Sequence, residues 1–284
     1  MPIIVGMDGS APSLRAAIWA ARESAIRGTS LRMLHVVSEW SYDVPLVPQP
    51  RTWGAEAEVA AREMLSHATD HVRANKPDLR VTADIIFGRT ADMLVGAAEE
   101  AQLLVVGSRG RGGFAELLLG SVSREVAARA PCPVAVVREQ HTGDRGEIVV
   151  GISGKPGQES LLDFAFREAV LRNATLRMVH TWVHPVTRWL GDLQPIVYDV
   201  DEMNQEEALR LNEAVAGWRE QFPDVVVVPH VVHGHAAQVL IETSADADIL
   251  VIGGRSGASA LFGQGGTAHA VLHHSRVPVV VVRP

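Results

Sequence analysis

The sequence predicts an α/β protein made of two tandem doubly wound domains, each built on a five-stranded parallel sheet. Two observations support this prediction. The 284-residue chain repeats itself at a spacing of 145 or 146 residues, which is too long for a solenoid and indicates a tandem duplication. Within each half, short runs rich in Val, Ile and Leu alternate with longer segments of helical period, as strands and crossover helices do.

The duplication is visible in both halves along most of their length. Three pairs of segments match: residues 19–37 with 164–182, 88–113 with 234–259, and 131–138 with 276–283. The polar segment 139–147 lies between the halves and is interpreted as the linker. The predicted domains are therefore residues 1–140 and 145–284.

The elements of the first half follow in order from its apolar runs. Strands are predicted near residues 2–7, 31–37, 80–87, 102–107 and 133–138. Because successive residues in these runs are apolar, each strand is expected to be covered on both faces. The helix before the second strand is expected to close at Gly28, matched by Asn173, since Gly and Asn best adopt the left-handed conformation.

Two loops are expected to meet at the carboxyl edge of the first sheet. Ligands of such sheets bind where the strand order reverses, which here places the first and fourth strands beside the crevice. Asp8 follows the first strand, and the glycine-rich stretch from Gly107 to Gly113 follows the fourth. Glycine lets a backbone approach a ligand closely, and consecutive amides form an anion-binding concavity.

A helix start follows the glycine loop in the sequence. Gly120, Ser121, Val122 and Ser123 precede the helical pattern "REVAARA". Free backbone N–H groups and the positive end of the helix dipole attract an anion there, and a Ser hydroxyl can add a bond. A phosphate chain would fit between this helix start and the glycine loop.

The spacing Gly107-x-x-Gly110-x9-Gly120-Ser121 resembles the nucleotide-binding motif of the universal stress protein family. The runs "IIVGMDGS", "LRMLHVV" and "CPVAVV" resemble the first, second and last strands of that family. The resemblance covers both halves and implies a Rossmann-like fold, similar to the adenine nucleotide alpha hydrolases, and membership of the ATP-binding subgroup. It implies that ATP, accompanied by Mg²⁺, is held by the following positions of the first half: Gly6, Asp8, Val36, Gly107, Ser108, Arg109, Gly110, Arg111, Gly112, Gly113, Gly120, Ser121, Val122 and Ser123.

The second half departs from this motif at two positions. Ser153 stands where the first half has Asp8, and Ser256 stands where it has Gly110. Ser256 must avoid a positive φ or accept strain of about 1–3 kcal/mol, so weaker nucleotide binding or none is expected there. The matching positions that remain as candidates for an occupied second site are Gly253, Arg255, Gly266 and Thr267.

Structural interpretations compete with these site assignments. Asp8 either fixes its loop or contacts a ligand, and Arg109 and Arg111 either lie in solvent or contact phosphate. For Ser121 and Ser123, helix capping and phosphate binding use the same backbone amides, so the two interpretations are compatible.

The sequence points to no catalytic apparatus. No nucleophile is paired with a general base, so at most slow ATP hydrolysis is expected. The glycines are followed by no Gly-Lys-Ser/Thr, and "GMDGSAPS" lacks G-x-G-x-x-G, which argues against a P-loop enzyme and a dinucleotide oxidoreductase. His230, His233 and His235 have no carboxylate or cysteine partner at ligand spacing, so no metal site is predicted, and Cys132 is a poor nucleophile.

Composition sets the expected setting and partners. The net charge of −7 argues against nucleic acid, and no apolar run approaches the length needed to cross a membrane. A single cysteine fits a cytoplasmic protein. The resemblance also implies association through the terminal strands, giving an intrachain pseudo-dimer, and leaves open whether whole chains form a homodimer.

Three functions remain open on the sequence. The first is an ATP-dependent signalling or stress-adaptation module with an unknown protein partner. The second is a nucleotide-independent interaction scaffold, and the third is an adenylating or nucleotide-hydrolysing enzyme. Two long connections, 38–54 and 182–200, carry Trp40 and Trp189 and are interpreted as lids, oligomer contacts or segments packed on their own domain.

Overall fold

A computed structural model describes residues 1–38, 53–110, 119–138, 145–154, 156–183, 200–254 and 266–284. It divides into two compact units, the first mainly Met1–His141 and the second mainly Thr142–Gly254 with Gln264–Val282. The predicted association through the terminal strands concerns the arrangement of the two units and stays a prediction. Trp40 and Trp189 lie outside the described residues.

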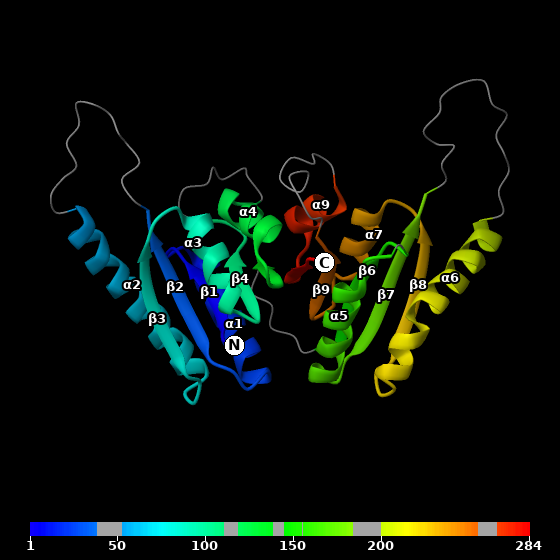
Figure 1. The fold of residues 1–284 in the computed structure, drawn as a ribbon, viewed down its shortest axis with the longest axis horizontal. Helices are drawn as coiled ribbons and strands as arrows, with labels where there is room; N and C mark the ends of the chain where they lie inside the picture. The colour runs from blue at the N-terminus through cyan, green and yellow to red at the C-terminus, as the bar shows by residue number, and fades with distance from the viewer. Residues whose placement is uncertain (39–52, 111–118, 139–144, 155, 184–199, 255–265) are drawn as a thin grey trace, which may run out of the picture. The chain divides into compact units, whose positions relative to one another are not determined.

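The first unit alternates strands and helices along the chain (Figure 1). Its elements are β1 (Ile3–Met7), α1 (Ala11–Ile26), β2 (Leu31–Val37), α2 (Trp53–Asn75), β3 (Val81–Phe87), α3 (Thr90–Ala97), the 3-10 turn η1 (Ala98–Glu100), β4 (Leu103–Gly107), α4 (Ser121–Arg129) and β5 (Val134–Val137). The described strands are parallel, in the order β3-β2-β1-β4-β5. Because the order reverses between β1 and β4, right-handed crossovers place α1 and α2 on one face of the sheet and α3 and α4 on the other.

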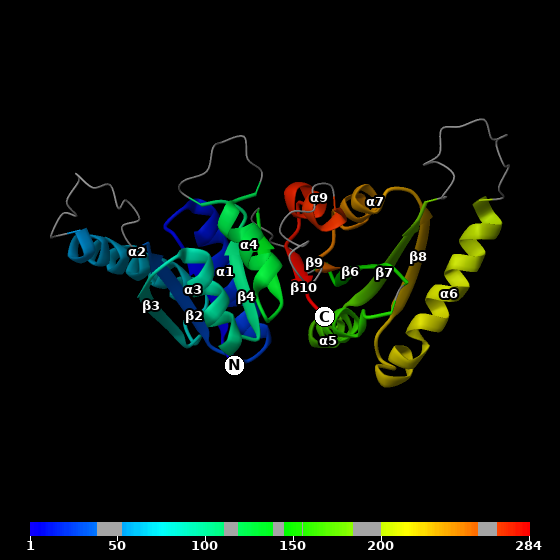
Figure 2. The same cartoon turned by 45° about the horizontal axis from the view of Figure 1, so that its top comes forward.

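The second unit repeats this arrangement. Its elements are β6 (Glu147–Ile152), α5 (Glu159–Arg172), β7 (Thr175–Trp182), α6 (Val200–Gln221), β8 (Val227–His233), α7 (Ala236–Thr243), β9 (Ile249–Gly253), α9 (Thr267–His274) and β10 (Val279–Val282). The described strands are again parallel, in the order β8-β7-β6-β9-β10. Figure 2 shows α6 running alongside β8 in this unit and α2 alongside β3 in the first. The predicted fold class is therefore confirmed.

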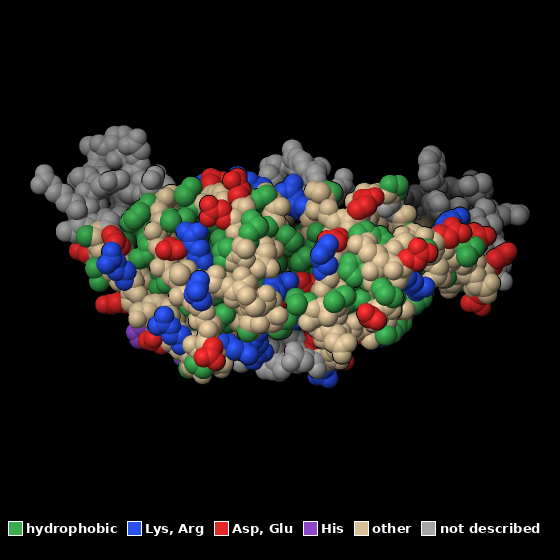
Figure 3. All heavy atoms as spheres, turned by 60° about the horizontal axis from the view of Figure 1, so that its bottom comes forward, with side chains coloured by type: hydrophobic (Ala, Val, Ile, Leu, Met, Phe, Trp, Pro, Cys, Tyr) green, Lys and Arg blue, Asp and Glu red, His purple; other side chains and the backbone are tan. Residues whose placement is uncertain are grey.

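The sheets form the cores of the two units. Ile3, Ile4 and Val5 of β1 are fully buried, as are Ile148 and Val149 of β6, so the central strands are covered on both faces as predicted. Basic and acidic side chains are interspersed on the molecular face drawn in Figure 3.

Local backbone chemistry begins and ends the first helix of each unit. The hydroxyl of Ser10 caps α1 by accepting a hydrogen bond from the Ser13 N–H at 3.2 Å. After α1 the chain turns through Gly28 at φ 61°, and after α5 it turns through Asn173 at φ 49°. The prediction that both residues adopt the left-handed conformation is confirmed.

The outer strands β3 and β8 differ at one edge position. In a parallel pair, alternate residues direct their backbone groups to the neighbouring strand. The backbones of Arg80 and Gly88 hydrogen-bond to β2, and those of Val226 and Gly234 hydrogen-bond to β7. The backbone N–H and C=O groups of the even-numbered residues between them therefore point towards the inner neighbouring strand. Pro229 therefore faces away from β7, where a missing N–H costs no ladder bond. Its counterpart in β3, 146 residues earlier, is Ala83.

We predict that Ala83→Pro changes the free energy of unfolding by less than about 1 kcal/mol, because the Ala83 N–H also faces outward. The matched variant Thr82→Pro should cost about 2–4 kcal/mol, since the Thr82 N–H faces β2 and its loss leaves an acceptor unpaired. Urea denaturation of both variants measures the difference. Equal destabilisation by the two substitutions would show that the register at this edge is wrong.

Candidate functional site

The loops after β1 and β4 meet at the point where the strand order reverses. A Cβ built on Gly110 would lie 2.5 Å from Asp8 Oδ2, so the glycine backbone and the carboxylate approach each other directly. Asp8 and Arg109 are half-buried, and Gly110 is exposed. The structure thus brings together two of the predicted site segments that are about 100 residues apart in sequence.

The Asp8 carboxylate organises the start of α1. Its Oδ1 accepts hydrogen bonds from the Ser10 N–H at 3.0 Å and from the Ser10 hydroxyl at 2.6 Å. Ser10 is the residue that caps α1, so Asp8 orients the cap while its other oxygen faces Gly110. The loop-fixing interpretation of Asp8 is therefore correct for Oδ1, and the ligand interpretation stays a prediction.

Close approach explains Gly107 and Gly110. A Cβ on Gly107 would lie 2.8 Å from the Pro12 carbonyl carbon, far inside van der Waals contact, so α1 begins directly against the end of β4. Neither Gly107 nor Gly110 has a positive φ. Gly110 therefore does not need the left-handed conformation on which the strain expected at Ser256 is based; Ser256 itself lies outside the described residues.

The two ends of the glycine loop are tied together by two short hydrogen bonds. The Gly120 N–H donates to the Ser108 carbonyl oxygen at 2.7 Å, and the buried Ser123 hydroxyl donates to the Gly107 carbonyl oxygen at 2.7 Å. The Ser108 N–H in turn donates to Val137 in β5 at 2.9 Å. These bonds fix the start of α4 beside Arg109 and Gly110. Arg111, Gly112 and Gly113 lie outside the described residues.

The first turn of α4 presents backbone donors. Gly120 is its N-cap and makes no side-chain capping bond, and the first turn carries no acidic residue. The N–H groups of Ser121, Val122 and Ser123 have no acceptor within the helix, as at every helix start. The Ser121 side chain is exposed, whereas the Ser123 hydroxyl is committed to Gly107. Any ligand bond from Ser123 would therefore come from its backbone.

Gly6 and Val36 lie within the sheet. A Cβ on Gly6 would lie 3.2 Å from Leu94 Cδ1, and the equivalent Gly151 has Leu240 Cδ1 at 3.0 Å. Both glycines thus make room for a leucine of the helix above, α3 or α7. Val36 is 8% exposed within β2. The structure gives these positions a packing role, and their predicted contact with nucleotide stays a prediction.

The carboxyl edge of the second unit is built differently. Ser153 donates from its N–H and its hydroxyl to Gln158 Oε1, at 3.0 and 3.1 Å, in place of the carboxylate chemistry of Asp8. Gly253 is exposed, and among the described residues a Cβ there would meet only Leu161 Cδ2 at 3.7 Å. A Cβ on Gly266 would meet no described atom within 4 Å.

The start of α9 also differs from that of α4. Gly266 and Thr267 are exposed, and Gly266 caps the helix without a side-chain bond. His269 stands where the first unit has Ser123; it is exposed, and its ring lies 4.1 Å from that of His273. Arg255 and Ser256 lie outside the described residues.

The histidines of the strands have structural partners. His35 Nδ1 lies 2.7 Å from the Met7 carbonyl oxygen, and His180 Nδ1 lies 3.0 Å from the Ile152 carbonyl oxygen, so each ties a second strand to a first strand. The His233 ring packs on Trp182 at 4.5 Å, and burial lowers the pKa of His230, with Arg177 adding to the effect. Among the described residues, no three or more His, Cys, Asp or Glu side chains gather as a metal site would require.

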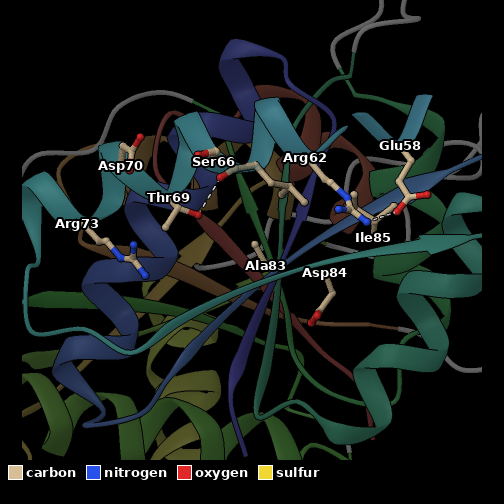
Figure 4. A pocket seen from close by; sticks show the side chains of 10 residues that line it. Glu58, Arg62, Ser66, Thr69, Asp70, Arg73, Ala83, Asp84 and Ile85 are labelled. Atoms are coloured by element: carbon tan, nitrogen blue, oxygen red, sulfur yellow. Dashed lines mark hydrogen bonds and ion pairs between the residues drawn. The ribbon is translucent and has the colours of Figure 1, made fainter. Parts of the chain in front are cut away.

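Described residues also line surface grooves away from the β1–β4 crevice. One groove of about 460 Å³ lies between α2 and the outer strand β3 (Figure 4). Its charged side chains include Arg62, which pairs with Glu58, and Asp84, which pairs with Arg32 of β2. No pattern in the sequence indicates this groove, because it depends on how α2 packs on β3.

A cluster of four charged residues at the start of α3 and on α4 could not be foreseen from the sequence. Arg89 and Asp92 are three residues apart and Glu125 and Arg129 four apart, so each pair was visible as a helical spacing. The pairing between the two helices was not visible. Arg89 reaches Glu125 at 2.6 Å, and Arg129 reaches Asp92 at 2.6 Å.

Comparison with known proteins places the chain in a family. The model of the universal stress protein family matches it twice, over residues 1–138 and 145–283. The chain belongs to the universal stress protein family. A universal stress protein of Mycobacterium tuberculosis is 37% identical over 294 residues, covering 99% of this chain and 96% of that protein. One from Mycolicibacterium smegmatis is 33% identical, covering 99% and 97%.

Solved structures share the architecture of this universal stress protein. The crystal structure of a universal stress protein from Archaeoglobus fulgidus matches with a TM-score of 0.75 at 17% identity, covering 99% of this chain and 96% of that one. A universal stress protein in complex with cAMP matches 49% of this chain at 29% identity, with a TM-score of 0.37. In the part of the chain that the structure describes, no helix is both long and apolar enough to cross a membrane.

We predict that Gly107→Ala destabilises the protein by roughly 1–3 kcal/mol, because its Cβ would overlap the Pro12 backbone. The matched substitution in the second unit, Gly253→Ala, should change stability by less than about 0.5 kcal/mol, since its Cβ has room. Thermal unfolding followed by circular dichroism compares the two. Similar losses would contradict the tight contact between α1 and β4.

Cys132 is predicted to be unreactive in the folded protein. The thiol is 8% exposed, and burial raises its pKa from 9.0 to about 11. Ellman's reagent at pH 8 should therefore label it far more slowly in buffer than in urea. Burial disfavours the charged thiolate in the folded state, so this group leaves the free energy of unfolding unreduced below pH 9. The free energy of unfolding falls as pH rises from 9 towards 11, because the thiol ionises more easily in the unfolded chain. Equal labelling rates with and without urea would contradict this.

Proposed function

We propose that the first unit binds ATP, accompanied by Mg²⁺, and that the protein acts as a nucleotide-dependent module in signalling or stress adaptation. The observation that carries this proposal is the convergence of Asp8, Gly110 and the first turn of α4 at the switch point of the sheet. It combines a carboxylate, a closely approaching glycine backbone and free helix donors, which are groups suited to a ribose and a phosphate chain.

The residues present fit such a ligand. Gly110 and Gly120 leave the loop backbone bare, and the two bonds from Gly120 and Ser123 hold the loop ends in place before a ligand arrives. Preorganised donors favour binding because less ordering is needed on association. Each charge-assisted hydrogen bond to phosphate contributes roughly 1.5–3 kcal/mol, so a few of them with adenine burial account for micromolar affinity.

We infer that the second unit binds nucleotide more weakly or not at all. Ser153 offers no carboxylate, and His269 cannot reproduce the bond by which Ser123 holds its loop. The four positions of that unit, Gly253, Arg255, Gly266 and Thr267, remain candidate contacts. No paired nucleophile and base accompany the proposed site, so at most slow hydrolysis is expected. Action in the cytoplasm remains a prediction from the sequence.

Calorimetry with ATP, in the presence and absence of Mg²⁺, tests the proposal. Wild-type protein should bind one ATP tightly per chain with micromolar affinity. A Cβ on Gly120 makes only ordinary van der Waals contacts, the nearest at 3.5 Å, so the fold should tolerate Gly120→Ala. Because this Cβ would lie between the glycine loop and the first turn of α4, the substitution should weaken ATP binding at least tenfold. Gly266→Ala, the same substitution in the second unit, should leave the affinity unchanged.

Three results would count against the proposal. Absence of ATP binding by the wild type would favour a nucleotide-independent scaffold. Equal weakening by Gly120→Ala and Gly266→Ala would remove the distinction between the units. Turnover of roughly 1 per second or faster would favour a nucleotide-hydrolysing enzyme. Mass spectrometry of the ligand released on heating would identify a nucleotide that is retained during purification.

A further inference from the structure

A four-residue ion network joins α3 to α4 in the first unit. The two terminal nitrogens of the Arg89 guanidinium, Nη1 and Nη2, donate to the Glu125 carboxylate at 2.8 and 2.6 Å, and Nη1 also donates to Asp92 at 3.1 Å. Arg129 bonds to Asp92 at 2.6 Å and also to Glu125. Each carboxylate is therefore shared by two arginines, and the bidentate pair fixes orientation as well as distance.

The network lies next to the proposed phosphate site. Glu125 is one helical turn beyond Ser121, the first residue of α4, and Arg129 ends the same helix. Arg89 is the N-cap of α3, and Asp92 lies in the first turn of that helix. Since α4 has only nine residues, a connection through Glu125 and Arg129 restrains the whole helix, including its first turn.

The second unit lacks this network, although it has the same fold. The counterparts at a spacing of 146 residues are His235 for Arg89, Gln238 for Asp92, Val271 for Glu125 and Ser275 for Arg129. The helices α7 and α9 nevertheless pack together as α3 and α4 do. The fold therefore does not require the network. Its presence in the first unit alone is connected with the nucleotide site proposed for that unit.

The network remains fully charged at neutral pH. The hydrogen bond from Arg129, and then that from Arg89, lowers the pKa of Asp92, while Arg89 is the main cause of the lowered pKa of Glu125. Carboxylates with lowered pKa values lose their stabilising effect only as pH falls through those values. The side chains are 21–61% exposed, so dissolved salt reaches and screens them.

We propose that Arg89, Asp92, Glu125 and Arg129 are positioning residues that hold the first turn of α4 in place for the phosphate chain. Through them, the phosphate affinity of the first unit responds to ionic strength. The inference rests on the proposed function, because it assigns a control to that same site. It predicts an effect on the binding of ATP and none on that of adenosine, which has no phosphate to contact the first turn of α4.

The test transplants the residues of the second unit into the first. The variant carries Arg89→His, Asp92→Gln, Glu125→Val and Arg129→Ser, a set with which the second unit already folds. At low salt it should bind ATP roughly three- to tenfold more weakly than wild type, with unchanged adenosine affinity. Its ATP affinity should also fall less steeply as salt is raised, because the component that depends on the network is absent.

A charge exchange provides the second arm. Arg89→Glu alone places three carboxylates together and should weaken ATP binding, whereas Arg89→Glu combined with Glu125→Arg restores an opposite-charge pair and should recover part of the affinity. A purely structural role would shift the unfolding temperature without separating ATP from adenosine. This arm also covers the case in which the fourfold variant fails to fold.

The outcomes separate the two proposals. If wild type binds no ATP, the proposed function fails and this inference fails with it. If wild type binds ATP and the fourfold variant has the same affinity and the same salt dependence, only the inference is overturned. Equal loss of ATP and adenosine affinity would also overturn it, since that result indicates general damage to the unit.

Discussion

The candidate site depends on the absence of side chains at the end of β4. Gly107 lets the start of α1 press against the strand, and Gly110 lets the loop backbone approach the Asp8 carboxylate. Once α1 is placed in this way, Ser10 caps it and Asp8 orients the cap. The hydrogen bonds from Gly120 and Ser123 then return the chain to the same point. One steric condition at the end of one strand therefore sets the positions of two helix starts.

The second unit shows what changes when that condition is relaxed. A Cβ on Gly110 would lie 2.5 Å from Asp8 Oδ2, so the carboxylate would have to move away from the loop. Where Asp8 is replaced by Ser153, the colliding carboxylate is gone, and the sequence carries Ser256 in place of glycine. The sequence therefore changes at both members of the close pair that Asp8 and Gly110 form in the first unit. Among the described residues, a Cβ on Gly253 would meet only Leu161 and a Cβ on Gly266 would meet nothing within 4 Å, in contrast to the close contact at Gly107.

The sequence was sufficient for the fold because its signals are local or repeated. Apolar runs predicted the strands, and the residue types of Gly28 and Asn173 predicted left-handed turns that the structure confirms. It was less informative about the site, where contacts are between distant residues. Nothing in the sequence shows that the Ser123 hydroxyl bonds to Gly107 or that Arg89 bonds to Glu125. Gly107 and Gly110 were singled out as ligand contacts, which stays a prediction; the structure shows that Gly107 lies close to Pro12 and Gly110 close to Asp8.

Comparison of the two units separates residues that hold the fold from residues that hold the site. Both units keep a histidine that bonds to the neighbouring strand, His35 or His180, and a glycine beneath a leucine, Gly6 or Gly151. These features lie within the sheet and are needed wherever the fold is needed. At the carboxyl edge of the first unit lie the Asp8 carboxylate and the Ser123 bond, with the Arg89 network nearby. The described part of the second unit carries other residue types at the matching positions, such as Ser153, His269 and His235. Because the second unit folds without such features, the fold does not need them, and their place at and near the carboxyl edge of the first unit agrees with the proposed nucleotide site.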